Sequence, residues 1–259
     1  MIIDSNAYIG HWPFRPLRNN TAQGLIELMD NKGIDKAVVS SIHSIFYKNS
    51  HAGNEELAAD VRRYEERLIP LAVLNPRYPG WEDDLKTCVE VFGMKGLRLF
   101  PYYHDYRLND PEALQLIEAA AGFSLPVFLP MRVVDMRQRH WFDTTENLLF
   151  ADIVKVVKRF EDSVTFVIQE GIYPTENHFF DEDTPKRVFY EISRLTSVYG
   201  KNLPQLLEKV GTERILFGTG IPFKYPEPTF LKIALLHLNE KEISKIFYKN
   251  IAEILNCSN

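Results

Sequence analysis

The stretch Ile-Ile-Asp-Ser-Asn-Ala-Tyr-Ile-Gly, residues 2–10, is the starting point for interpreting the rest of the chain. It reads as a buried strand, over residues 1–5, that continues to a turn at Gly10 and leads into an aromatic loop containing Trp12. Side chains alternate along a strand, so Asn6 and Tyr8 lie on one face. Their place at the end of the strand favours the lining of a pocket. In the alternative interpretation they fill the interior and bond to each other.

Seven further short runs rich in Val, Ile, Leu and Phe follow along the chain, and segments with helical spacing separate them. Helix start signals agree with this pattern, because Thr21 and Thr145 suit an N-cap and Asp110 precedes a proline. We expect strands at 1–5, 36–42, 68–74, 96–100, 126–129, 164–169, 188–193 and 214–218. The expected helices cover 21–31, 54–66, 81–91, 111–122, 145–160, 202–210, 228–238 and 240–255.

This alternation predicts an α/β fold with one parallel sheet covered by helices. Eight strand–helix units in 259 residues favour a single closed (β/α)8 TIM barrel, with one domain over residues 1–259. No Gly-x-Gly-x-x-Gly follows the first strand, which counts against a dinucleotide fold. The irregular part is 171–186, between the sixth and seventh strands, where we expect a distortion made of a loop with one short helix.

Composition narrows the function classes. The chain has 30 Lys and Arg against 35 Asp and Glu, a formal net charge of −5, and no clustered basic segment, so nucleic acid is not an expected partner. Apolar runs fall far short of a membrane span, and the N-terminus has no basic region or apolar signal core. Cys88 and Cys257 have no metal or redox spacing, which is typical of a reducing compartment. We expect a cytoplasmic protein.

Polar residues stand at the carboxyl ends of the expected strands, where the chemistry of such barrels is located. Arg98 comes from the fourth strand and Arg132 follows the fifth, and arginine is suited to bidentate capture of carboxylate or phosphate. These residues predict a small anionic ligand. The equally weighted alternative is that both arginines pair with Glu170 and Asp135 in a buried network. Tyr102 lies in an aromatic loop after the fourth strand and is a candidate wall of the pocket or of a subunit interface.

Five segments resemble the amidohydrolase-related branch of the amidohydrolase superfamily, and together they extend over the whole barrel. That branch includes metal-dependent hydrolases and decarboxylases of the aminocarboxymuconate-semialdehyde type, so the resemblance implies a TIM barrel and that class of chemistry. The segments are Ile-Asp-x-Asn-x-Tyr-Ile-Gly at 3–10, Gly-Met-Lys-Gly-Leu-Arg-Leu-Phe-Pro at 93–101, Leu-Pro-Val-Phe-Leu-Pro at 125–130, Arg-Ile-Leu-Phe-Gly-Thr-Gly-Ile-Pro at 214–222 and Lys-Ile-Phe-Tyr-Lys-Asn-Ile-Ala at 245–252.

The resemblance also locates the family's metal site, and this sequence departs from it. The family's His-x-His, its fourth-, fifth- and sixth-strand histidines and its eighth-strand aspartate match Asn6, Tyr8, Phe100, Pro130, Gln169 and Gly220. Proline and glycine side chains offer no ligand, and neutral amides and a phenol are poor ligands for a transition metal. We therefore expect no metal and no cofactor at this position. The alternative is a displaced metal site that uses His11, His43, His104 or Glu170.

Two functional hypotheses follow. In the first, the chain is a hydrolase or lyase without a metal centre, with Tyr8 or Glu170 in proton transfer and Asn6 or Gln169 orienting the substrate. Arg98, Arg132, Trp12 and Tyr102 complete the expected substrate-binding set. In the second, the barrel is catalytically inactive and binds a metabolite or a protein partner, as a homo-oligomer through its aromatic loops. The sequence does not choose between hydrolysis, lactone opening and decarboxylation.

Overall fold

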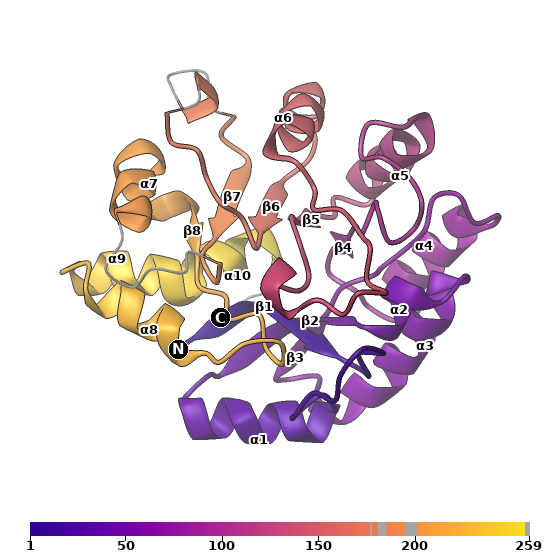
Figure 1. Ribbon diagram of the computed structural model, residues 1–259, viewed down its shortest axis with the longest axis horizontal. Helices are drawn as coiled ribbons and strands as arrows, with labels where there is room; N and C mark the ends of the chain where they lie inside the picture. Colours follow the sequence, from indigo (N-terminus) through magenta and orange to yellow (C-terminus); the bar gives the residue numbers. More distant parts are fainter. Residues whose placement is uncertain (177, 181–184, 195–200, 257–259) are drawn as a thin grey trace.

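The computed structural model describes residues 1–176, 178–180, 185–194 and 201–256 (Figure 1). Within them the chain forms eight strands that alternate with helices, as the sequence predicts. The first strand is longer than expected, because burial of all seven residues continues to Ile9. The strands are β1 (Ile3–Ile9), β2 (Lys36–Ser41), β3 (Leu68–Pro70), β4 (Leu97–Arg98), β5 (Val127–Pro130), β6 (Phe166–Gln169), β7 (Val188–Glu191) and β8 (Ile215–Leu216).

All strand pairs are parallel, in the order β1-β2-β3 and β4-β5-β6-β7-β8. Parallel bridges join the two sheets at both seams, between Ala72 and Leu97 and between Ala7 and Ile221. The backbone amide of Ser5 also donates to the carbonyl of Phe217 at 3.0 Å. The predicted α/β TIM barrel is confirmed, and the carboxyl ends of its strands meet at one mouth.

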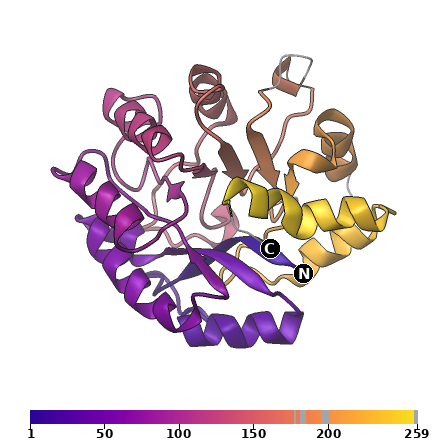
Figure 2. The ribbon, with the colours of Figure 1, turned by 180° about the vertical axis from the view of Figure 1, so that it is seen from behind.

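The helices surround the strands in both views (Figures 1 and 2). Thr21 caps the first helix, since its side chain accepts from the amide of Gly24, as predicted. The expected helix start at Thr145 is wrong: Arg139 donates to the Thr145 carbonyl and to Asn147, which holds this segment outside the helix. The helices are α1 (Ala22–Lys32), α2 (His43–Phe46), α3 (Ser50–Val61), α4 (Trp81–Glu90), α5 (Pro111–Gly122), α6 (Phe150–Arg159), α7 (Asn202–Val210), α8 (Glu227–Ala234), α9 (Glu240–Ser244) and α10 (Asn250–Ile254).

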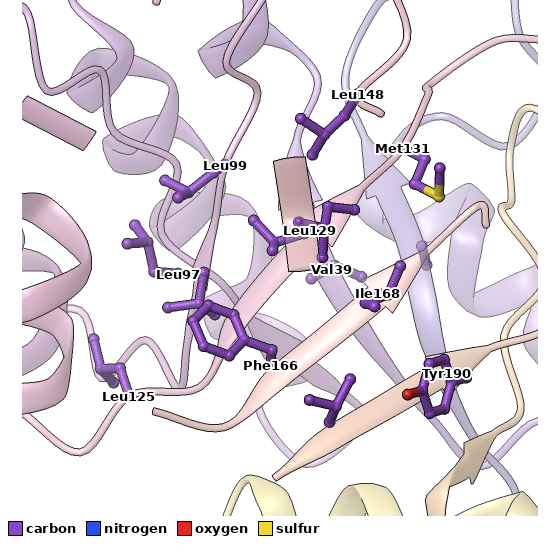
Figure 3. Close-up of a cluster of buried hydrophobic side chains, with 14 of the residues drawn as sticks. Val39, Leu97, Leu99, Leu125, Leu129, Met131, Leu148, Phe166, Ile168 and Tyr190 are labelled. Carbon is purple, nitrogen blue, oxygen red and sulfur yellow. The ribbon is translucent and has the colours of Figure 1, made fainter. Parts of the chain in front are cut away.

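Three apolar layers hold the barrel together. The largest lies between strands and helices, and Figure 3 shows part of it, including Leu129 and Phe166. A second fills the barrel interior at the end opposite the mouth and includes Ile251 of α10. The helix α10 crosses in front of the strands in Figure 2 and closes this end. The third is an apolar layer at the mouth, in which aromatic rings, including those of Tyr8 and Trp12, pack with aliphatic side chains. Aromatic rings therefore form part of the wall of the mouth.

The connection between β6 and β7 is irregular, as expected. A 3-10 turn at His178–Phe180 is its only helical element among the described residues, while 177 and 181–184 of this connection lie outside them. Among the helices formed by the described residues, none is long and apolar enough to cross a membrane.

Candidate functional site

Three strands bring polar side chains to one point of the mouth. Asn6 comes from β1, Gln169 ends β6, and Glu191 ends β7; all three side chains are fully buried. Glu170 follows β6 with a φ of 52°, so the strand has ended before it. This left-handed turn places the Glu170 carboxylate beside the other side chains, where regular alternation would have turned it away.

Glu170 is the centre of an ion-pair network. Lys224 Nζ, from the loop after β8, lies 2.6 Å from Oε1 and 2.5 Å from Oε2 of this carboxylate. Arg132 Nε lies 3.7 Å from Oε2, and Arg132 Nη1 donates to Asp135 Oδ2 at 3.0 Å. The Glu170 side chain is 2 % exposed, against 23 % for Lys224. A buried carboxylate is thus paired with an ammonium that reaches toward solvent.

A second carboxylate, Glu191, lies directly against the first. Its Oε2 accepts from the backbone amide of Glu170 at 3.0 Å and from Asn6 Nδ2 at 3.2 Å. Ser193 Oγ lies 2.5 Å from Glu170 Oε1 and 3.0 Å from Glu191 Oε2, so its proton can be donated to either carboxylate. Burial, with the neighbouring Glu170 charge, raises the pKa of Glu191 above its ordinary value. Glu191 therefore holds a proton more readily than an exposed glutamate does.

Two glycines make room for this cluster. A Cβ added to Gly218 would lie 2.4 Å from Glu191 Oε1, and one added to Gly220 would lie 2.9 Å from Glu170 Oε1. Gly220 also has a φ of 75°, which disfavours other residues. The eighth strand end contributes space to the mouth, and the polar atoms come from Glu170, Glu191 and Lys224.

Arg98 lies inside the barrel and not in the ion-pair network. It is fully buried, with Nη1 donating to the Ala7 carbonyl at 3.1 Å and to Ser40 Oγ at 2.8 Å. Its Nε and Nη2 have no hydrogen-bond partner among the described residues. Burial lowers the pKa of the guanidinium. The predicted pairing with Glu170 and Asp135 is thus found for Arg132 and is wrong for Arg98.

Tyr8 packs under this arginine. The Arg98 guanidinium carbon lies 4.5 Å from the centre of the Tyr8 ring, and the phenol oxygen has no hydrogen-bond partner among the described residues. Burial raises the pKa of Tyr8 well above its ordinary value, so the phenol is suited to donate a hydrogen bond and not to act as a base. Its hydroxyl and the two Arg98 nitrogens are buried polar atoms without a partner among the described residues, which is unusual in a folded protein.

The aromatic residues predicted to line the site lie in two places. Trp12 packs edge-on against Phe223 with ring centres 5.0 Å apart, inside the apolar layer at the mouth. Tyr102 borders a pocket of about 20 Å³ that Arg132 and Glu146 also line, and this volume holds about one water molecule. Gln169 donates to the Ser5 carbonyl at 2.7 Å, which ties its side chain to the backbone of β1.

The sequence interpretation missed Glu191 and Lys224. Glu191 is the one acidic residue in the apolar run Val-Phe-Tyr-Glu-Ile-Ser, residues 188–193, and a charge inside a buried strand is a usable signal. Lys224 has a weaker signal, because it stands four residues after Gly220 in a loop whose direction the sequence does not specify.

The histidines considered for a displaced metal site have other partners. His43 accepts from the His11 amide at 2.9 Å through Nε2, and its Nδ1 lies 2.6 Å from Glu56 Oε2. His104 Nε2 lies 2.9 Å from the Ser44 carbonyl. No three His, Cys, Asp or Glu side chains in the described part of the chain form a group that could hold a metal ion.

His104 gives a pH-dependence prediction. Burial lowers its pKa to about 4, below the 6.5 of an unperturbed histidine, so only the unfolded chain binds this proton between these values. Stability is therefore lost as pH falls from 6.5 toward 4, by at most about 1.4 kcal/mol per pH unit for this group. We expect the ring proton signals of His104 to titrate near pH 4 by NMR; a midpoint above 6 would show a solvated ring and contradict the burial.

Known proteins share this architecture. A model of the amidohydrolase family matches residues 9–257. The chain belongs to the amidohydrolase family. Three solved structures are similar over 98 % of this chain. The first is 2,6-dihydroxybenzoate decarboxylase from Rhizobium, with 14 % identity, 98 % of that chain covered and a TM-score of 0.73. The others are a probable 2-pyrone-4,6-dicarboxylic acid hydrolase from Acinetobacter baumannii with citric acid bound (15 % identity, 99 % of that chain covered, TM-score 0.70) and a dihydroxybenzoic acid decarboxylase from Polaromonas with bound manganese and the inhibitor 2-nitroresorcinol (14 % identity, 96 % of that chain covered, TM-score 0.73). At these identities the likeness concerns the fold.

Because one of these structures holds manganese, we compared this chain's donor atoms with the needs of a metal. The five positions that the resemblance assigns to metal binding and catalysis carry Asn6, Tyr8, Pro130, Gln169 and Gly220, and they supply no imidazole or carboxylate. Asn6 turns its Nδ2 donor toward both glutamates. The nearby carboxylate of Glu170 already binds an ammonium. The residues at these positions do not fit a divalent metal.

Proposed function

We propose that this amidohydrolase-family barrel is a hydrolase or lyase that acts on a small carboxylate without a metal centre. The observation that carries the proposal is the pair of contiguous carboxyl groups, Glu170 and Glu191, next to the Lys224 ammonium at the mouth. A carboxyl group whose pKa is raised by burial, as that of Glu191 is, is a usual participant in acid–base chemistry near neutral pH. The arrangement retains the means to move protons.

Each residue then has a defined task. Glu170 transfers a proton to or from the substrate or the attacking water. Lys224 stabilises the negative charge that develops on the substrate or on the water. Glu191, with its raised pKa, supplies or receives that proton through the hydroxyl of Ser193. Asn6 donates to both carboxylates and fixes their separation. In a decarboxylation this proton replaces the lost carboxyl group, and in a hydrolysis it comes from water.

Cations on both sides of this cluster favour an anionic substrate. Arg132 borders the mouth, and Arg98 holds two free donors deeper in the barrel next to the Tyr8 hydroxyl. Guanidinium groups suit planar carboxylates. The similar structures include proteins named for 2,6-dihydroxybenzoate and 2-pyrone-4,6-dicarboxylic acid, which supports ring carboxylates as the first class to test.

The test compares two arginines that share one partner. Arg132 and Arg137 both bind Asp135, but Arg132 also reaches Glu170 while Arg137 is 83 % exposed. Binding and turnover of 2,6-dihydroxybenzoate, 2-pyrone-4,6-dicarboxylate and related acids are measured by calorimetry and by product release. We expect Arg132→Ala to weaken binding about tenfold or more and Arg137→Ala to leave it unchanged. Equal effects, or no binding by any acid of the panel, would refute the proposal.

The second candidate is a barrel without catalysis that binds a metabolite or a protein partner. The segment beside the mouth supports it, because Trp141 and Phe142 are 74 % and 65 % exposed. Exposed neighbouring aromatics are typical of contact surfaces, including those of homo-oligomers. Ligand binding without product formation, together with a dimer that Trp141→Ser dissociates in sedimentation experiments, would favour this candidate over the enzyme.

A further inference from the structure

We propose that the Lys224 ammonium is a built-in cation that takes the place of a divalent metal ion and excludes such ions from the mouth. Removing it would uncover a cation site formed by Glu170 and Glu191. The inference rests on the proposed metal-free function, and it assigns to one residue the reason why the mouth needs no metal.

The contacts of Lys224 are those of a bound cation. Its Nζ bridges both oxygens of Glu170, at 2.6 and 2.5 Å, and lies 3.4 Å from Ser193 Oγ. The same hydroxyl contacts Glu191, so ammonium, hydroxyl and both carboxylates form one cluster. Two adjacent buried carboxylates repel each other when both are ionised, and a positive charge beside them offsets this repulsion. Lys224 supplies that charge from the chain itself.

The glycine at position 220 agrees with a lysine in the place of a metal ion. A Cβ there would lie 2.9 Å from Glu170 Oε1 and 3.2 Å from Lys224 Cδ. The volume that a longer side chain at 220 would enter is already taken by the carboxylate and the lysine stem. An acidic residue at 220 is thus incompatible with Lys224 in its present place. Gly220, where the resemblance implies an aspartate, thus leaves room for the Lys224 side chain beside Glu170.

Without Lys224, the cluster has the composition of a site for a hard cation. Glu170 and Glu191 offer carboxylate oxygens and Ser193 a hydroxyl, the ligand types that Mn²⁺ and Mg²⁺ prefer. Arg132 remains 3.7 Å from Glu170 and Arg194 Nη1 donates to the Glu170 carbonyl, so some positive charge persists. We therefore expect affinity in the micromolar to millimolar range and not tighter.

The experiment is a Mn²⁺ titration of the full chain, followed by the loss of the free-ion EPR signal and by thermal unfolding. We expect Lys224→Ala to bind one Mn²⁺ and to unfold several degrees higher when the ion is saturating, since a ligand that binds only the folded state stabilises it. Wild type and the charge-preserving Lys224→Arg should bind none. Lys245→Ala is the surface control, because it breaks a pair with Glu213 that is 62 % exposed.

Stoichiometric binding of Mn²⁺ to wild type at the same site, abolished by Glu170→Gln, would overturn the inference. The absence of binding by Lys224→Ala would also overturn it. Should the alanine variant fail to fold, Lys224→Met keeps the stem without the charge and is titrated in its place. The Mn²⁺ titration and the carboxylate panel are independent measurements. A negative titration refutes the role of Lys224 and does not affect the result of the acid panel. Failure of every acid in the panel to bind refutes the proposed function, and the titration can still be interpreted.

Discussion

Glu170→Gln is expected to lower both stability and turnover more than any other single conservative change in the mouth. The substitution keeps the size of the side chain but leaves the ammonium of Lys224 and the guanidinium of Arg132 without their shared carboxylate. Removing one partner of a buried ion pair costs about 3–5 kcal/mol. For a chain of this size that corresponds to a fall of roughly 10 °C in Tm. Turnover should fall by about 10³-fold, as for loss of a proton-transfer group.

The matched control is Glu213→Gln, which breaks a close Lys–Glu pair, with Lys245, on the surface. Exposed pairs contribute about 0–1 kcal/mol, so Tm should hardly move and turnover should be unchanged. Calorimetric unfolding and product release measure both effects. A Glu170→Gln protein as stable as wild type would show that the network is not buried as described.

Arg98→Met is expected to weaken ligand binding while the free energy of unfolding stays the same or rises. Arg98 is fully buried with two nitrogens lacking partners among the described residues, so its charge weakens the fold. Replacing such a charge by an apolar side chain of similar volume is often neutral or stabilising, by about 1–4 kcal/mol. Carboxylate binding should weaken by about 100-fold, because charged hydrogen bonds are worth about 1.5–3 kcal/mol each.

Arg137→Met provides the control, since that side chain is 83 % exposed and remote from the barrel interior. Urea unfolding gives the stability of each variant, and calorimetry gives the Kd for the acid. If the free energy of unfolding of Arg98→Met were lower by about 3–5 kcal/mol, Arg98 would be a structural residue whose partners hold the strands together. That result would contradict its proposed role in ligand binding.

The sequence predicted the barrel well because apolar runs and helical spacing are local signals. Element ends were less certain: the strand expected over 1–5 runs to Ile9, since burial and not composition sets its length. The helix expected from Thr145 begins at Phe150, because contacts from Arg139 hold the intervening residues extended. Such contacts depend on tertiary packing that no local pattern encodes.

The site residues were predicted from strand position and alternation, and these local rules place some of the side chains correctly at the mouth. Asn6 and Gln169 lie where alternation puts them, whereas Glu170 reaches the mouth through a left-handed backbone conformation. Lys224 was missed because a loop brings it back over the mouth. Loop geometry sets which groups long charged side chains pair with. Arg132 therefore pairs with Glu170 and Asp135 as expected, whereas Arg98 donates to the Ala7 carbonyl.

The central claim is that the mouth binds carboxylates with its own cations and not through a metal. The most direct test is the Kd of the tightest-binding acid of the panel, measured by calorimetry before and after exhaustive dialysis against EDTA, with metal content checked in both samples. The account predicts the same Kd in both. Binding that disappears after dialysis and returns on addition of Mn²⁺ or Zn²⁺ would contradict it.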